Sequence, residues 1–471
     1  PFINQHNSMK KSLLLATALM MGASAFAETE GVTYPNKEGY TFTNLWVNCN
    51  AKGEWKSYAE KQIPSMDYVA TATGSASEAI VASSKSFGVN DKGETGLVDQ
   101  GQLIIFDINT GAYLRNVALT IDGQPLTGLL CANHIGTDDY NNVYLFGYKA
   151  STWNDTKNEP NPLNIYLVDT TTGALTLIAA PALDEDFRHM NGRVDHIDVV
   201  GDITRQQAGC VVMAAPSAPA DKRYLYAWAC EQGSDEFYGH LAGGSYIGLE
   251  ISECFPAAEG PWGGGAFVGI LRDEEHSGTL AYIDAMNYLP ALYGNEGEMV
   301  SSFADVEDPD KEIVPHGNPN GAFEFTVGDN TFLMYPYEEY DPAPCANRAR
   351  IVKYGTVGDM STITKMYDFP QIGMGVHKGA GRRTHILQAN VVTDEAGKQG
   401  AYILSYKTGN GLARFLLAEE GFNGGAGVSD IVVEDENAPV EYFNLQGIRV
   451  ANPENGVFIR RQGSSVSKVV L

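Results

Sequence analysis

The sequence predicts an all-β protein made of repeated four-stranded units, and three observations support this. Short apolar runs rich in Val, Ile, Tyr and Phe recur along the chain, with turn residues between them. The run Leu163–Ile178 (LNIYLVDTTTGALTLI) reads as two such strands around a D-T-T-T-G turn, and Leu103–Val117 repeats the pattern. The chain of 471 residues contains 51 glycines, as many tight turns require, and its 44% hydrophobic content is sufficient for a core.

The strand candidates fall into six groups, five of four strands each and a less clear fourth group with two strands and a segment, Ala285–Leu292, that is compatible with a helix. The groups are Tyr68–Thr73, Glu78–Ser83, Leu103–Ile108, Ala112–Leu119; Gly128–Ile135, Val143–Tyr148, Ile165–Asp169, Ala174–Ala179; Val194–Val200, Cys210–Ala214, Tyr224–Ala229, Tyr246–Ile251; Ala266–Leu271, Thr279–Ile283, Ala285–Leu292; Ala322–Val327, Phe332–Tyr337, Arg350–Tyr354, Ile363–Phe369; Ile372–His377, Thr384–Val392, Ala401–Tyr406, Ala413–Leu417.

The spacing of these groups decides the architecture. The turn residue after the third strand recurs about every 60 residues, a period typical of repeat folds with one antiparallel sheet per repeat. We therefore predict a β-propeller of about six four-stranded blades, or seven, followed by a small C-terminal β-domain. A β-sandwich is the alternative, although sandwiches rarely contain so many strands. The isolated aromatic run Phe42–Val47 is the candidate for a strand that closes the ring.

The first residues predict export. Met9-Lys10-Lys11 forms a basic n-region, Ser12–Gly22 is apolar, and Ala25 and Ala27 provide a small-x-small cleavage pattern. We expect cleavage after Ala27, with residues 1–8 as an upstream extension outside the fold. No later run approaches about 18 apolar residues, so we expect no membrane span in the mature chain. The predicted domains are a leader at 1–27, a propeller at 28–430, a linker at 431–438 and a C-terminal domain at 439–471.

The last segment, 439–471, contains four short strand candidates, at Val440–Asn444, Gly447–Val450, Val457–Arg461 and Val466–Leu471. With Tyr442, Asn444 and Gly447 in its first hairpin, Gly456–Ile459 in the next and Lys468–Val470 at its end, it resembles the C-terminal sorting domain of the type IX secretion system. The resemblance implies a Gram-negative cell, secretion machinery as a partner, and export to the periplasm, the outer cell surface or the medium. A small docking or ring-closing sheet is the alternative.

The repeated part resembles the secreted β-propeller proteins of the same bacteria, at the level of the fold only. The D-x-x-T-G hairpins and the run Val200–Thr204 carry this resemblance. The formal net charge of −26, from 58 acidic and 32 basic side chains, repels phosphate backbones and therefore argues against a nucleic-acid partner.

The six cysteines follow no metal-binding spacing. Cys210 begins one strand candidate and Cys230 ends the next, so a hairpin centred near Ala220 sets the two opposite each other. An exported protein can form a disulfide there, and two buried thiols are the alternative.

Four histidines follow the repeat: His134, His196, His316 and His377 each lie at or near the first strand of a unit. First strands line the axial channel of a propeller, so their imidazoles are candidates for a divalent metal or for hydrogen bonds to a sugar, with unrelated loop histidines as the alternative. No other cofactor is indicated. Trp153 and Trp262 lie in loop-like settings and are candidates for stacking on sugar rings.

Enzyme motifs are missing from the sequence. It contains no G-x-S-x-G, H-E-x-x-H or G-x-x-x-x-G-K-[ST] pattern, and no catalytic residue is nominated. The favoured hypothesis is an exported, non-catalytic protein that binds a glycan or a protein partner at the cell surface. A glycoside hydrolase or lyase on the propeller scaffold is one alternative, because sequence distance does not reveal paired carboxylates across a cleft. A purely structural surface protein is the other.

Overall fold

The structure is a computed structural model of the chain. It describes residues 33–49, 70–89, 92–127, 131–148, 164–179, 196–202, 207–213, 224–229, 246–250, 266–270, 280–284, 291–293, 299–303, 306–307, 313, 323–337, 348–371, 373–375, 385–407, 410–424, 440–443, 449–450, 457–462 and 465–470. The chain divides into two compact units, Pro1–Phe422 and Asn423–Leu471.

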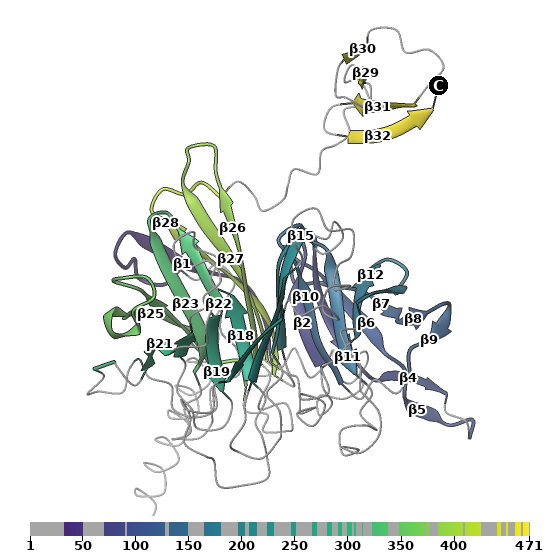
Figure 1. The fold of residues 1–471 in the computed structure, drawn as a ribbon, viewed down its shortest axis with the longest axis horizontal. Coiled ribbons are helices and arrows are strands. Elements are labelled where there is room, and N and C mark those ends of the chain that lie inside the picture. Colours follow the sequence, from purple (N-terminus) through teal and green to yellow (C-terminus); the bar gives the residue numbers. More distant parts are fainter. Residues whose placement is uncertain are drawn as a thin grey trace, which may run out of the picture. The chain divides into compact units, whose positions relative to one another are not determined.

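The first unit contains six four-stranded antiparallel sheets, which we call blades one to six in chain order (Figure 1). Blades one to five consist of β2 (Ala70–Gly74), β3 (Glu78–Ser83), β6 (Gln102–Asp107), β7 (Tyr113–Ala118); β10 (Cys131–Thr137), β11 (Val143–Tyr148), β12 (Asn164–Val168), β13 (Leu175–Ala179); β14 (His196–Asp202), β15 (Gln207–Met213), β16 (Tyr224–Ala229), β17 (Tyr246–Glu250); β18 (Ala266–Ile270), β19 (Leu280–Asp284), β20 (Ala291–Tyr293), β21 (Met299–Ser302); β22 (Phe323–Val327), β23 (Asn330–Tyr337), β24 (Arg348–Lys353), β25 (Thr364–Phe369). The described residues of this unit also form two short hairpins, β4 (Ser86–Val89) with β5 (Thr95–Val98) and β8 (Thr120–Ile121) with β9 (Gln124–Pro125), and the 3-10 turn η7 (Met360–Thr362).

Blade six joins the two ends of the ring. Its first three strands are β26 (His385–Thr393), β27 (Gln399–Lys407) and β28 (Gly411–Glu419), and its outermost strand is β1 (Tyr40–Cys49). β1 pairs with β28 from Tyr40 opposite Glu419 to Cys49 opposite Gly411. The prediction that Phe42–Val47 belongs to the strand that closes the ring is therefore confirmed.

The first strands of neighbouring blades contact one another in the sequence β2, β10, β14, β18, β22, β26 and back to β2. This closed series defines a six-bladed β-propeller, the predicted fold class, with the first strands around the axis. The apolar core lies between blades. One cluster joins blades five and six, a second joins six and one, and a third joins one and two. In the described part of the chain, blades one, five and six thus bury both faces against their neighbours.

One strand prediction and one helix prediction were wrong. Ile372–His377 was expected to be a strand of blade six, but its described part, residues 373–375, is irregular, and β1 supplies the fourth strand instead. Ala285–Leu292 was considered as a helix, but Ala291–Tyr293 forms strand β20, and residues 285–290 lie outside the described residues. Both segments are mainly apolar and short, so periodicity alone does not separate strand, helix and buried loop.

The second unit contains a four-stranded sheet in the order β30-β29-β31-β32, formed by β29 (Val440–Phe443), β30 (Arg449–Val450), β31 (Val457–Gln462) and β32 (Ser465–Val470). These strands coincide closely with those predicted for 439–471. The leader with Ala25 and Ala27 lies outside the described residues. Within the described part of the chain, no helix is long and apolar enough to cross a bilayer.

Candidate functional site

The best-defined functional candidates lie where the first strand of a blade turns into the second. Strands alternate in direction within each sheet, so the first turn of every blade, and the turn between its third and fourth strands, lie at the same end of the ring. We call this the turn end. Four first turns are described, at residues 75–77, 138–142, 328–329 and 394–398.

The first turn of blade two is held by one carboxylate. Oδ1 of Asp138 accepts hydrogen bonds from the backbone N–H groups of Tyr140 and Asn142, both at 2.9 Å, and Oδ2 accepts one from Nδ2 of Asn142 at 2.9 Å. Asn141 takes the left-handed conformation with φ of 63°. Asp138 is buried, whereas the side chain of Tyr140 is 59% exposed. The turn therefore exposes an aromatic ring on a backbone that the hydrogen bonds of Asp138 hold in place.

The first turn of blade six has the same construction with different exposed residues. Oδ1 of Asp394 accepts from the N–H groups of Ala396 and Lys398, both at 2.9 Å, and Gly397 takes the left-handed conformation with φ of 80°. Ala396 thus occupies the position that Tyr140 occupies in blade two. Since the turn forms equally well around alanine, the ring of Tyr140 is not required by the turn.

The turns between third and fourth strands use aspartate in a similar way. Oδ1 of Asp169 accepts from the N–H groups of Thr171 and Thr172 at 2.8 and 3.2 Å, and Oδ2 accepts from the Thr172 hydroxyl at 2.7 Å. These hydrogen bonds, with that of the Thr172 side chain the strongest, hold the pKa of Asp169 below its ordinary value. Asp107 holds the equivalent turn of blade one through Asn109 and Thr110. These carboxylates are structural acceptors.

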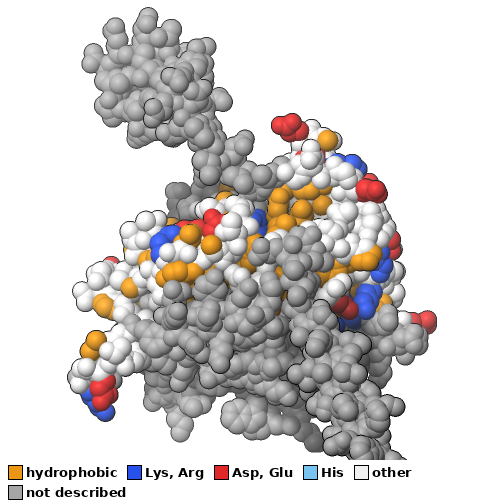
Figure 2. Space-filling model, turned by 180° about the vertical axis from the view of Figure 1, so that it is seen from behind, with side chains coloured by type: hydrophobic (Ala, Val, Ile, Leu, Met, Phe, Trp, Pro, Cys, Tyr) orange, Lys and Arg blue, Asp and Glu red, His pale blue; other side chains and the backbone are white. Residues whose placement is uncertain are grey.

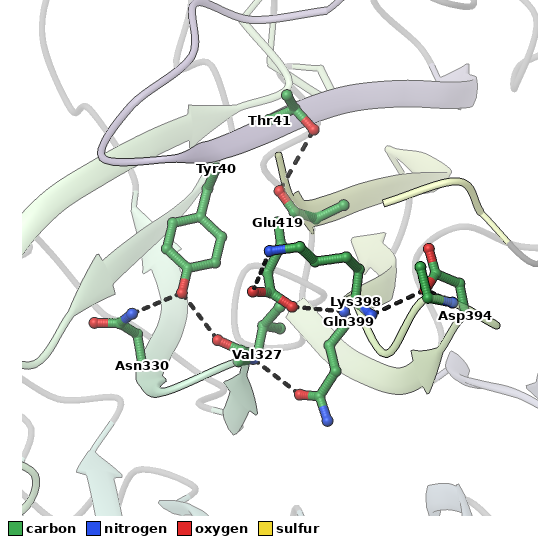
Figure 3. A network of polar contacts seen from close by, with 11 residues as sticks. Tyr40, Thr41, Val327, Asn330, Asp394, Lys398, Gln399 and Glu419 are labelled. Atoms are coloured by element: carbon green, nitrogen blue, oxygen red, sulfur yellow. Dashed lines mark hydrogen bonds and ion pairs between the residues drawn. The ribbon is translucent and has the colours of Figure 1, made fainter. Parts of the chain in front are cut away.

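A polar network joins blades five and six at the turn end (Figure 3). The hydroxyl of Tyr40 donates to the carbonyl of Val327 at 2.9 Å and accepts from Nδ2 of Asn330 at 2.7 Å. Oε1 of Gln399 accepts from the N–H of Gly328 at 2.9 Å, which links the first turn of blade five to blade six. Burial, with nearby carboxylates, raises the pKa of Tyr40, so its phenol stays protonated and donates.

A buried polar group lies in blade six at the opposite end of the ring. Nε2 of His385 and Oγ of Ser405 are 2.8 Å apart, and both residues are fully buried. The pair has the contact geometry of a nucleophile and a base, but complete burial denies it a substrate. Lys407 lies opposite His385 in the ladder and is also buried.

Blade five holds an ion pair between the buried Arg350 and the partly buried Asp368. Nε and Nη2 of Arg350 donate to the two carboxylate oxygens of Asp368 at 2.5 and 2.9 Å, and Lys365 lies 3.0 Å from the same carboxylate. Burial alone would raise the pKa of Asp368, but these two cations outweigh it and hold the pKa below the ordinary value. Asp368 is therefore ionised at neutral pH and unsuited to act as a general acid.

The structure leaves most sequence-predicted site residues untested. His134 lies within β10 and His196 begins β14, both first strands, but only their backbones are described. His316, His377, Trp153 and Trp262 lie outside the described residues. Among the residues that the structure does describe, no three His, Cys, Asp or Glu side chains gather in a geometry that could hold a metal ion. The histidine site stays a prediction.

The predicted disulfide is likewise untested. Cys210 lies in β15, where the register places Trp228 of β16 opposite it, and Cys230 lies outside the described residues. Tyr140 was not nominated from the sequence. The available signal was the segment Asp138–Asn142, in which an aromatic residue interrupts a polar turn directly after a first strand.

No protein-family model and no curated protein sequence matches this chain. Among solved structures, it is similar to an α-L-arabinofuranosidase of Fusarium graminearum in complex with an iminosugar inhibitor, with a TM-score of 0.40, 10% identity, and coverage of 75% of this chain and 95% of that one. It is also similar to a Trypanosoma rangeli sialidase in complex with sialic acid (TM-score 0.33, 7% identity, coverage 84% and 57%). A third is an α-L-arabinanase of Cellvibrio cellulosa complexed with arabinohexaose (TM-score 0.29, 10% identity, coverage 65% and 90%). At these identities the likeness concerns the fold alone.

Proposed function

We propose that this protein is an exported, non-catalytic glycan-binding protein that uses the turn end of its propeller, with Tyr140 as the main contact. The observation that supports the proposal is the exposed ring of Tyr140 on a turn that blade six builds around Ala396. A large exposed aromatic side chain with no structural duty is a candidate for recognition.

The surroundings of Tyr140 suit a sugar. The apolar face of a pyranose or furanose ring stacks on a phenol ring, and hydroxyl groups at the sugar's edge need donors and acceptors beside it. Asp139 and Asn141 come directly before and after Tyr140 in the chain, and both are exposed. Together they offer a carboxylate acceptor and an amide that both donates and accepts. Because Asp138 fixes the backbone beforehand, little ordering entropy is lost on binding.

The test is a glycan array with the full mature chain, followed by titration of each hit with Tyr140→Ala and Tyr140→Phe. We expect the alanine variant to lose about tenfold in affinity, since stacking and ring burial are lost, and the phenylalanine variant to keep most of it. Leu177→Ala is the matched control, because Leu177 is 53% exposed in β13 and belongs to no turn. Unchanged binding by Tyr140→Ala contradicts the proposed site, and turnover of a polysaccharide by the purified protein contradicts the non-catalytic role.

We further propose that the first and last segments direct export, with the leader removed after Ala27 and residues 439–471 acting as a sorting module. The order of basic, apolar and small residues in the leader supports the first part. The motif residues Tyr442 and Val457–Ile459, which fall on strands of a separate compact unit, support the second.

Export is tested in a Gram-negative host that has type IX machinery. Full-length protein should reach the cell surface or medium with Glu28 as its first residue, and a chain lacking residues 439–471 should stay in the periplasm. A host without that machinery is the control. Equal export of both chains would show that the C-terminal unit does not sort.

A further inference from the structure

His385 is a buried histidine at the start of the axial strand of blade six, the blade that closes the ring. It is the first residue of β26, the strand of blade six nearest the axis, and it pairs across the ladder with Lys407, the last residue of β27. The exposed fraction of His385 is 0% and that of Lys407 is 1%. Two basic side chains on paired positions of the ladder are therefore both buried.

Only one of the two ring nitrogens of His385 has a hydrogen-bond partner. Nε2 contacts the hydroxyl of Ser405 at 2.8 Å, and Nδ1 is buried without any hydrogen-bond partner. A neutral imidazole tolerates this arrangement, because a single N–H can be placed on either nitrogen. The protonated ring has two N–H groups, so one of them would be buried without an acceptor while the ring carries a full charge.

No described carboxylate faces the ring to offset that charge. Along the same face of blade six, β26 continues with Leu387, β27 with Ile403 and β28 with Ala413, and these residues pack in the core shared with blade five. In the row of His385, β27 contributes Lys407, β28 contributes Gly411 and β1 contributes the Cys49 thiol.

Burial, and then the charge of Lys407, lowers the pKa of His385 well below its ordinary value.

We propose that His385 is an acid-sensitive latch: its protonation separates the start of β26 from the end of β27 and loosens the seam between blades five and six. The latch lies in the blade that closes the ring, where β1 and β28 meet. Opening there exposes the axial strand of blade six at the end opposite the turn end, without requiring the Tyr140 turn to change.

The direction of the pH effect follows from linkage. The unfolded or opened state binds the proton at the ordinary histidine pKa, about 6.5, and the closed state binds it only at lower pH. The stabilisation is therefore complete above about pH 6.5. It is lost as the pH falls below that value, by up to about tenfold in the closed-to-open equilibrium constant per pH unit for this one group.

The experiment compares the wild-type protein with His385→Gln in denaturant titrations between pH 8 and pH 4.5. Glutamine can keep a hydrogen bond to Ser405 but cannot take up a proton. We expect the ratio of the two unfolding constants to change by up to about tenfold per pH unit below 6.5 and to stay constant above it. Parallel profiles down to pH 4.5 would overturn the proposal.

Hydrogen exchange on the wild-type protein tests the latch without any variant. This measurement therefore tests the proposal even if His385→Gln does not fold. After correction for intrinsic rates, we expect amides of 386–391 and 401–406 to lose protection at pH 5 relative to pH 7, while those of β23 and β24 in blade five keep theirs. Equal loss in both blades, or loss in neither, contradicts a local latch.

Discussion

At the scale of single residues, aspartate in this protein mainly organises turns. Asp107, Asp138, Asp169 and Asp394 each accept backbone N–H groups of the turn that they begin. Each turn exposes donors that would otherwise need water, so a short ionisable acceptor at its first position stabilises it. The acidic composition of the chain is thus partly a consequence of its many turns, and an aspartate at a turn is a poor indicator of catalysis.

A glycine in one of these turns also contacts the neighbouring blade. Gly173 of blade two has φ of 76°, and its carbonyl accepts from the N–H of Thr120, next to the outer strand of blade one, at 2.9 Å. A Cβ at Gly173 would lie 2.0 Å from the carbonyl oxygen of Ala118. The D-x-x-T-G turn is therefore a contact between blades, and glycine is needed there for space as well as for conformation.

Gly173→Ala tests this contact against Gly397→Ala. Both glycines have positive φ, but nothing lies within 4 Å of a Cβ at Gly397. Gly397→Ala should cost about 1–2 kcal/mol for the left-handed conformation alone. Gly173→Ala must in addition displace the backbone of blade one, so we expect at least twice that loss in the free energy of unfolding, measured by urea titration. Equal losses would show that the turn yields without disturbing its neighbour.

At the scale of elements, most strands were predictable because short apolar runs are separated by turn residues such as Gly, Asp and Asn. The hairpin Leu163–Ile178 forms β12 and β13 as expected. The failures have physical causes. β20 is three residues long, too short for a period, and Ile372–His377 shows that apolar content alone does not make a strand.

The candidate site was much less predictable than the strands. Tyr140 stands out for two reasons: its side chain is exposed, and a turn of the same construction in blade six carries Ala396 at that position. A single sequence reveals neither the exposure nor the match between the two turns. His385 likewise follows no motif. Its environment arises from Ser405 and Lys407, which the β26–β27 ladder brings beside it. The exposure of Tyr140 and the surroundings of His385 both arise from the tertiary structure, and the local sequence pattern does not reveal them.

β1 depends on Phe42 for its place in blade six. The ring is fully buried, stacks with Tyr367 at a centroid distance of 4.9 Å and with Phe415 at 5.6 Å, and meets the edge of Phe369 at 5.2 Å. We expect Phe42→Ala to cost about 3–5 kcal/mol, because it leaves a cavity where blades five and six join. The same denaturation series with exposed Leu114→Ala should show little change. A loss below about 1 kcal/mol would mean that the seam refills the cavity.

At the scale of the whole molecule, the large negative net charge does not appear as one continuous acidic surface on the described part of the face in Figure 2. The chain carries −26, yet charged side chains on the described part of the surface in Figure 2 occur as small groups of both signs rather than as one acidic field. Several carboxylates are paired, such as Asp368 with Arg350 and Glu78 with Arg115. The described part of the face in Figure 2 therefore favours recognition by shape and hydrogen bonds over attraction of a polycation.

The ring should be self-sufficient once the residues up to Phe422 are present. The β1–β28 ladder ends at Glu419, the N–H of Glu420 donates to the carbonyl of Gly39 at 2.8 Å, and Phe422 packs so closely on Gly400 that a Cβ there would lie 2.7 Å from its ring. We expect a chain of residues 28–422 to keep the thermal midpoint of the ring in the full mature chain, followed by circular dichroism. A chain that stops at Gly411 lacks β28, so β1 has no partner, and it should show no cooperative transition. A lowered midpoint for 28–422 would contradict the division at Phe422 and show that residues 423–471 contribute to closing the propeller.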